Sequence, residues 1–133
     1  ILAALGAWPA ESFVARGRTL AVYDRAEEVA ALRPDFAAMR RVAGADAIAT
    51  APGRNGVDFV SRYFAPNYGV DEDPVTGSAH CVLTPYWAAR LGKEQLTARQ
   101  ISARGGELTC TLRGDRVTIA GHAVLYLEGA ISV

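Results

Sequence analysis

The sequence predicts an α+β domain in which a curved, mostly antiparallel sheet wraps around one buried central helix. Two observations predict this class. Short segments of alternating apolar and polar residues recur between glycines, which is typical of strands joined by tight turns. Residues 78–91, by contrast, carry apolar side chains in almost every direction around a helical axis, which is typical of a buried helix.

The length and net charge of the chain limit the class of protein to which it can belong. The chain has 133 residues and half of them are apolar, so we expect one domain over residues 1–133 with one sizeable core. Fourteen basic and fourteen acidic side chains give a formal charge of zero, which argues against a nucleic-acid partner. Cys81 and Cys110 lie far apart with no disulfide framework around them, so we expect a cytoplasmic protein. The apolar start at residues 1–5 is too short for a signal peptide, and no run approaches a membrane span.

The first predicted strands form a hairpin. Residues 12–16 and 19–23 flank Gly17-Arg18, a pair suited to a two-residue turn with positive φ at its first position. Further strands are predicted at residues 46–50, 57–64, 97–102 and 123–127.

A second hairpin is predicted near the end of the chain. Residues 107–113 alternate strictly, so their apolar side chains lie on one face. Gly114-Asp115 then turns the chain into residues 116–119.

Two short helices precede the long apolar one. Residues 26–32 form a helix that stops before Pro34, and residues 35–43 form another with Asp35 as N-cap and Gly44 at its end. The second carries three apolar residues on one face: Phe36, Met39 and Val42. In the long helix, Pro85 predicts a kink one turn from the start, and Gly92 ends it.

The loop before the long helix carries the chemistry. It delivers the unpaired N–H groups of Gly77, Ser78 and Ala79 to the positive end of a helix dipole, which attracts anions. The hydroxyls of Thr76 and Ser78 can cap the helix or bind a carboxylate oxygen. Ordinary capping, with residues 71–73 as a solvated acidic loop, explains the same pattern. The residues alone leave both interpretations open.

An ordered string of motifs resembles one known family. It consists of RYFAP at residues 62–66, GVDEDPVTGSAHC at 69–81, PYW at 85–87, LGK at 91–93, QISARGGEL at 100–108 and VTIAG at 117–121. These segments are similar, in the same order, to landmarks of the phenazine-biosynthesis PhzF-like proteins. The similarity is strong from about residue 48 onward and weaker before it.

The resemblance implies a fold and an activity. PhzF-like proteins share the diaminopimelate-epimerase-like fold, with two lobes and the active site between them, and are cofactor-independent isomerases. It implies Asp73 and Ser78 as catalytic residues, and Thr76, Gly77, Ser78 and Ala79 as the substrate-binding loop, with no metal. The family's acid/base glutamate lies in an N-terminal lobe that this chain lacks. We therefore expect a C-terminal lobe that acts on a small carboxylate-bearing metabolite and is inactive alone.

Three alternatives compete with this interpretation. A thiol-dependent racemase is disfavoured because Asp73-Pro74 occupies the place expected for the thiol, while Cys81 falls in the apolar helix. A metal site is disfavoured because the Cys and His residues fit no zinc spacing; His80 is expected to be structural. A non-catalytic module that binds an anion or forms a homodimer stays open.

Overall fold

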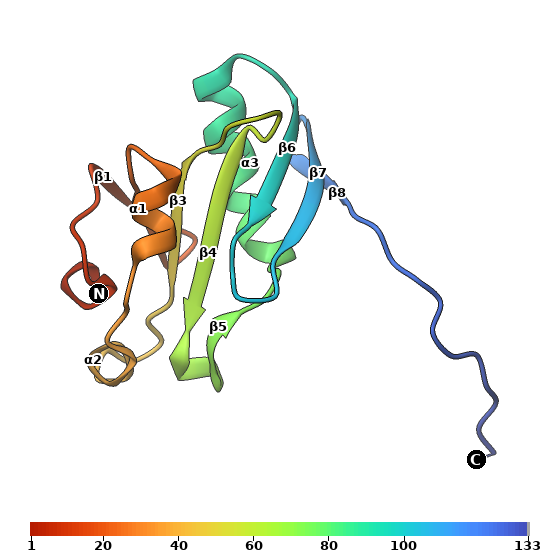
Figure 1. The fold of residues 1–133 in the computed structure, drawn as a ribbon, viewed down its shortest axis with the longest axis horizontal. Coiled ribbons are helices and arrows are strands. Elements are labelled where there is room, and N and C mark those ends of the chain that lie inside the picture. Colours follow the sequence, from red (N-terminus) through yellow and green to blue (C-terminus); the bar gives the residue numbers. More distant parts are fainter. Residues whose placement is uncertain (133) are drawn as a thin grey trace.

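The computed structural model describes residues 1–132, which form an open, mixed sheet with few helices (Figure 1). The helices are α1 (Ala26–Ala31), α2 (Phe36–Arg40) and α3 (Gly77–Leu91), with 3-10 turns at Leu2–Leu5 and Pro66–Tyr68. The strands are β1 (Glu11–Ala15), β2 (Arg18–Val22), β3 (Ala47–Pro52), β4 (Phe59–Ala65), β5 (Val70–Asp73), β6 (Gln95–Gln100), β7 (Gly106–Arg113) and β8 (Arg116–Ala120). The predicted α+β class is confirmed.

Strand order brings distant segments together. The sheet runs β1-β2-β3-β4-β6-β7-β8, and β5 pairs with β4 beyond the end of the β4–β6 pairing. The β2–β3 and β4–β6 pairs are parallel, and the other pairs among the described strands are antiparallel. Each parallel pair is joined by a helix-containing crossover, as parallel strands require. The crossover from β4 to β6 contains α3.

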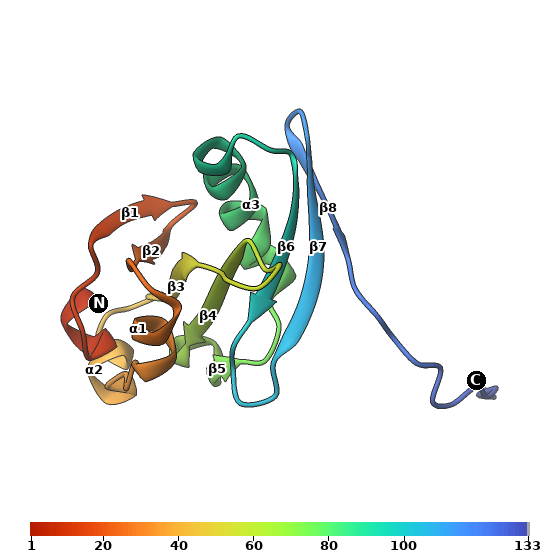
Figure 2. The same ribbon diagram turned by 45° about the horizontal axis from the view of Figure 1, so that its top comes forward.

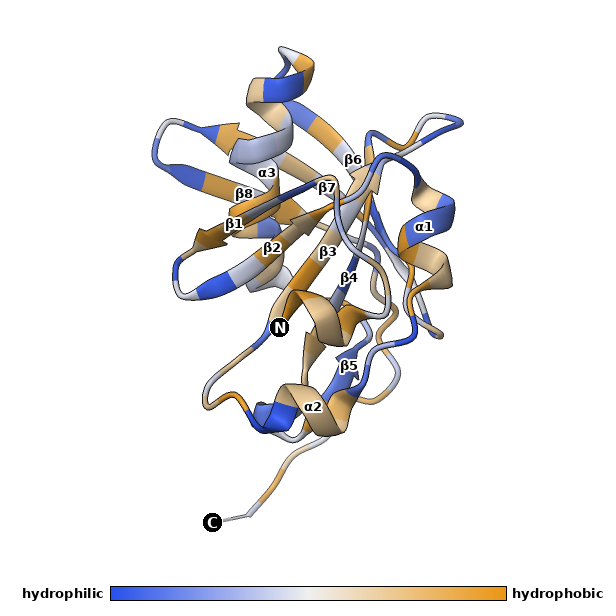
Figure 3. Ribbon diagram, turned by 90° about the vertical axis from the view of Figure 1, so that its left-hand side faces the viewer, coloured by the Kyte–Doolittle hydropathy of each residue, from blue (hydrophilic) through white to orange (hydrophobic). Residues whose placement is uncertain are grey.

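The sheet separates two layers of apolar side chains. Helix α3 lies on one face and α1 and α2 on the other (Figure 2). The α3 side packs Trp87 and Leu83 against strand residues such as Phe59, and the other side packs Val29 and Met39. Figure 3 shows hydrophobic residues concentrated along the central strands β2 and β3, which are covered on both faces.

Helix α3 is buried on one side only, whereas the sequence predicted burial all round. Its buried residues, which face the sheet, are Ala79, His80, Leu83, Thr84, Trp87 and Ala88. Pro85, Ala89 and Leu91 are exposed, because an open sheet covers only one side of the helix. Gly92 ends the helix in the left-handed conformation, as predicted. No helix within residues 1–132 is both long and apolar enough to cross a bilayer.

Three local predictions need correction. The first hairpin turns at Arg16-Gly17, one residue earlier than predicted, with positive φ at both positions. Helix α2 is capped by Asp35 as predicted, but it ends at Arg40. The segment predicted as a loop at residues 70–73 is strand β5.

The strand predicted at residues 123–127 is absent from the described structure. Residues 121–132 carry no helix or strand and leave the body of the sheet beyond β8 (Figures 1 and 2). A strand requires a partner for its N–H and C=O groups, and an apolar run alone does not supply one. Val124, Leu125 and Tyr126 are therefore exposed.

A buried hydrogen-bond chain anchors α3 to the sheet. The indole Nε1 of Trp87 donates to the hydroxyl of Thr50 at 3.0 Å, and this hydroxyl donates to the carbonyl of Val60 at 2.7 Å. The Trp87 ring also stacks on Phe59, with ring centroids 5.9 Å apart. Since Thr50 is fully buried, water cannot replace either hydrogen bond.

Thr50→Val tests this anchor. The substitution keeps the side-chain shape but leaves the Trp87 N–H and the Val60 carbonyl without their partner, so we expect the free energy of unfolding to fall by about 2 to 3 kcal/mol. Thr118→Val, at an exposed position in β8, is the matched control and should change it by less than about 0.5 kcal/mol. Equal urea midpoints for the two variants would contradict the anchoring role.

Candidate functional site

The candidate site begins where β5 passes into α3. Asp73 is the last residue of β5 and pairs with Tyr63 of β4, so the two side chains lie on the same face of the sheet. Thr76 is extended, with φ −118° and ψ 99°, and the helix begins at Gly77. The loop of residues 74–76 is thus bounded by Asp73, which is fixed by sheet pairing, and by Gly77, which is fixed by the helix.

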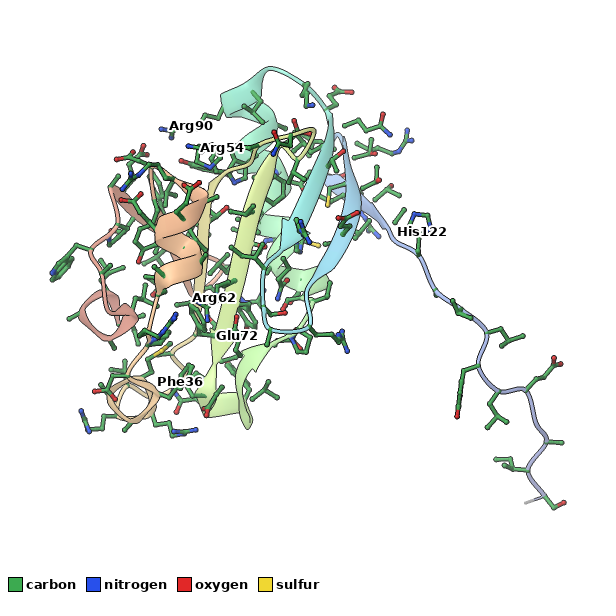
Figure 4. The ribbon with its side chains drawn as sticks, viewed as in Figure 1. Phe36, Arg54, Arg62, Glu72, Arg90 and His122 are labelled. Carbon is green, nitrogen blue, oxygen red and sulfur yellow. The ribbon has the colours of Figure 1, made fainter. Side chains whose placement is uncertain are left out.

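The acidic run at residues 71–73 is not a free solvated loop, because each carboxylate has a partner. Asp71 pairs with Arg40, and Glu72 receives two hydrogen bonds from Arg62 at 2.7 and 2.8 Å. Arg62 and Glu72 lie against each other in Figure 4. Adjacent strand residues point to opposite faces, so Asp73 lies on the side of α3, away from Glu72. Its Oδ2 accepts the hydroxyl of Thr76.

Gln100 clamps this loop. Its side-chain Oε1 accepts the Thr76 N–H at 2.8 Å, while its Nε2 donates to the Asp73 carbonyl at 2.6 Å and to the Thr76 hydroxyl at 3.1 Å. Gln100 is fully buried. The sequence prediction missed this role, although one signal was present: Leu96, Ala98 and Gln100 alternate inward along β6, and an inward polar residue requires buried partners.

The first amides of α3 are open. The first backbone hydrogen bond at this end joins His80 N to Thr76 O at 3.3 Å. Within residues 1–132, the N–H groups of Gly77, Ser78 and Ala79 have no partner, because the Thr76 hydroxyl bonds to Asp73 and does not cap the helix. Gly77 and Ser78 are exposed, so their amides can reach a ligand, whereas Ala79 is buried.

The β6–β7 loop supports the other side of this segment. The Ser102 hydroxyl donates to the Pro74 carbonyl at 2.7 Å and accepts the Gly105 N–H at 3.0 Å. A Cβ on Gly106 would lie 2.4 Å from Cγ2 of Val75, so only glycine permits this approach. The loop before α3 is therefore held from two strands.

His80 lies directly beneath the loop. Its Nδ1 lies 2.7 Å from the Thr76 carbonyl, so the neutral ring carries its proton on Nδ1 and donates there. The ring is fully buried beside Phe59, and burial lowers its pKa. His80 therefore helps to position the loop.

The predicted residues Asp73, Thr76, Gly77, Ser78 and Ala79 all lie within one short segment around the start of α3. The two cysteines are not part of it. Cys81 is half-buried in α3, less enclosed than predicted, and burial raises the pKa of Cys110. Among residues 1–132, no group of three or more His, Cys, Asp and Glu side chains gathers in a way that could hold a metal ion.

Comparison with known proteins identifies the family. The family described as "Phenazine biosynthesis-like protein" (PhzC-PhzF) matches residues 9–129. This chain belongs to that family. An uncharacterized isomerase of Pseudomonas aeruginosa is 57% identical to this PhzF-like chain over 128 residues, which cover 96% of the chain and 49% of the relative.

Solved structures agree on the fold of the PhzF-like chain. A phenazine biosynthesis PhzC/PhzF protein from Clostridium difficile superposes with a TM-score of 0.86 at 40% identity, covering 98% of this chain and 50% of the other. A PhzF-family protein from Enterococcus faecalis gives 0.80 at 43% identity, covering 92% and 50%. The chain thus spans about half the length of the relatives it matches.

Gln100→Glu tests the clamp. A buried carboxylate cannot donate to the Asp73 carbonyl, so we expect a loss of about 3 kcal/mol in the free energy of unfolding and faster hydrogen exchange at Thr76. Gln95→Glu, on an exposed position of the same strand, is the matched control and should change neither. Unchanged exchange at Thr76 in the Gln100 variant would contradict the clamp.

The buried His80 predicts a pH dependence of stability. Because the folded-state pKa lies below the ordinary value of about 6.5, the unfolded chain binds more protons as the pH falls below 6.5. The free energy of unfolding should therefore fall there, by up to about 1.4 kcal/mol per pH unit. His80→Asn should remove this component from urea unfolding between pH 5 and 7.5, whereas His122→Asn, in the exposed tail, should retain it. The same slope in both variants would show that His80 is not its source.

Proposed function

We propose that this PhzF-like chain is the C-terminal lobe of a cofactor-independent isomerase, which moves a proton on a small carboxylate-bearing metabolite in the cytoplasm. Membership of a family whose relatives include a named isomerase supports the reaction class. The observation that carries the proposal is the pair of open amides at Gly77 and Ser78, next to a loop that also fixes Asp73.

The open amides suit a carboxylate. Two exposed N–H groups at the start of a 15-residue helix present donors and the positive end of the helix dipole to the same point. The Ser78 side chain is exposed beside them and supplies a hydroxyl donor. Because Gln100, Ser102 and His80 hold the loop, these donors need little rearrangement to bind an anion.

Asp73 is the proposed proton-handling group of this lobe. Thr76 donates to Oδ2 only, which leaves Oδ1 without a partner among the described residues. That oxygen can accept a proton from the substrate, relay one, or bind an amino group. The hydrogen bond from Thr76 fixes the rotation of the carboxylate and so directs the free oxygen.

The second half of the site belongs, in this proposal, to an N-terminal lobe that carries the acid/base glutamate. Relatives about twice as long as this chain support this division. Large apolar side chains are exposed on β1 (Phe13 and Val14) and on the tail (Val124 to Leu127), as expected where another lobe packs. The chain alone then lacks activity.

Carboxylate binding is tested with two ligands of equal shape, benzoate and benzamide. In an NMR titration of the chain, benzoate should shift the amide signals of Gly77 and Ser78, and benzamide, which lacks the charge, should shift them far less. Similar shifts from both ligands, or none from benzoate, would refute the carboxylate site.

Asp73→Asn tests catalysis in a hybrid that joins the N-terminal half of the Pseudomonas aeruginosa relative to this chain. We expect the hybrid to incorporate solvent deuterium into a member of a panel of amino and hydroxy acids, measured by mass spectrometry. Asp73→Asn should slow incorporation about 100-fold or more while benzoate still binds. Asp115→Asn, in the exposed β7–β8 turn, should have no effect.

Two outcomes would count against the enzyme. Full activity of the Asp73 variant would remove Asp73 from the mechanism. Benzoate binding with no deuterium incorporation by the hybrid would favour a non-catalytic anion-binding module.

A further inference from the structure

A cavity adjoins the candidate site on the α3 side of the sheet. It has a volume of about 240 Å³ and is lined by Arg18, Tyr63, Ala65, Tyr68, Val70 and Asp73. Asp73 is thus shared between this cavity and the loop that precedes α3. The volume is below that of pockets for drug-sized ligands, so the cavity suits one end of a small molecule.

Arg18 is anchored at one end and open at the other. Its Nε donates to Oδ2 of Asp46 at 3.1 Å, and Asp46 is only 3% exposed. The hydroxyl of Tyr63 donates to the same oxygen, and the guanidinium carbon of Arg18 lies 5.5 Å from the centre of the Tyr63 ring. Within residues 1–132, neither Nη1 nor Nη2 of Arg18 has a hydrogen-bond partner. Asp46 therefore holds the guanidinium of Arg18 in place and leaves its Nη1 and Nη2 free to donate at the cavity.

The charges around the cavity select its ligand. Asp46 compensates the charge of Arg18, and Asp73 adds a further negative charge, so the group of three has a net charge of −1. A second anion would be repelled by Asp73, whereas a neutral hydroxyl or carbonyl oxygen accepts a hydrogen bond from Arg18 without that repulsion. The rings of Tyr63 and Tyr68 and the side chain of Val70 suit an apolar body next to this oxygen.

We infer that the Arg18 cavity binds the end of the substrate remote from its carboxylate, with Arg18 donating to a neutral hydroxyl or carbonyl oxygen. This inference rests on the proposed function, because Asp73 joins the cavity to the carboxylate-binding amides. It assigns Arg18 as a specificity-determining residue and Asp46 as the residue that positions it.

The test compares benzoate with 3-hydroxybenzoate, which differ by one hydroxyl, in NMR titrations of the chain. We expect 3-hydroxybenzoate to bind about tenfold more tightly, as for one hydrogen bond to a charged donor, and to shift the Nε–H signal of Arg18. Arg18→Gln should abolish this preference and leave benzoate affinity within about twofold. Arg16→Gln removes the same charge two residues away, at an exposed position in the turn, and should leave the preference intact.

Arg18→Lys is the control for misfolding, because it retains a cation beside Asp46 but lacks the planar guanidinium. It should bind benzoate normally and show no preference for the hydroxyl. The inference would be overturned if the unsubstituted chain bound benzoate and 3-hydroxybenzoate with equal affinity. It would also be overturned if the preference for 3-hydroxybenzoate survived in both Arg18 variants.

Phenol separates this inference from the proposed function, since it carries the hydroxyl without the carboxylate. A shift of the Arg18 Nε–H signal by phenol, with no effect of benzoate at Gly77 and Ser78, would sustain the cavity and refute the carboxylate site. The reverse result would refute the cavity and sustain the carboxylate site.

Discussion

The hydrogen bonds of Gln100 are the constraint on which the site depends. One buried amide satisfies the N–H and the hydroxyl of Thr76 and the carbonyl of Asp73, so it fixes both ends of the turn between β5 and α3. An amide suits this position because it donates and accepts at once without introducing a buried charge. With the turn fixed, the Thr76 hydroxyl is directed to Asp73 rather than to the helix, and the first amides of α3 stay open.

Arg62 performs the corresponding task on the opposite face. It holds Glu72 with two hydrogen bonds and also donates to the carbonyls of Val29 and Leu32 at the end of α1. A partly buried ion pair of this kind contributes little net stability, since desolvation offsets much of the attraction. Its effect is positional: β5 is held by Arg62 from one face and by Gln100 from the other, and Asp73 has little freedom to move.

Local pattern predicted the parts of the fold that depend on neighbours in sequence. Strict alternation located β7 and β8, and Asp35 marked the start of α2. Predictions that depend on distant partners failed. The apolar run at residues 123–127 has no strand to pair with in the described structure, and within residues 1–132 no layer covers one side of α3. The candidate loop residues from Asp73 to Ala79 were proposed from a contiguous motif, and their role stays a prediction. Gln100 acts on residues 24 and 27 positions away and was not predicted.

The same distinction explains why the motif before α3 is only part of the site. Asp73 owes its direction to pairing with Tyr63, and Tyr63 in turn shares Asp46 with Arg18 from β2. Strands β2 and β4 therefore both place a side chain against the carboxylate of Asp46, which lies far from either in sequence. No single sequence motif contains all three residues. In the proposed site, the amides of Gly77 and Ser78 recognise the acid and Arg18 selects which acid is bound.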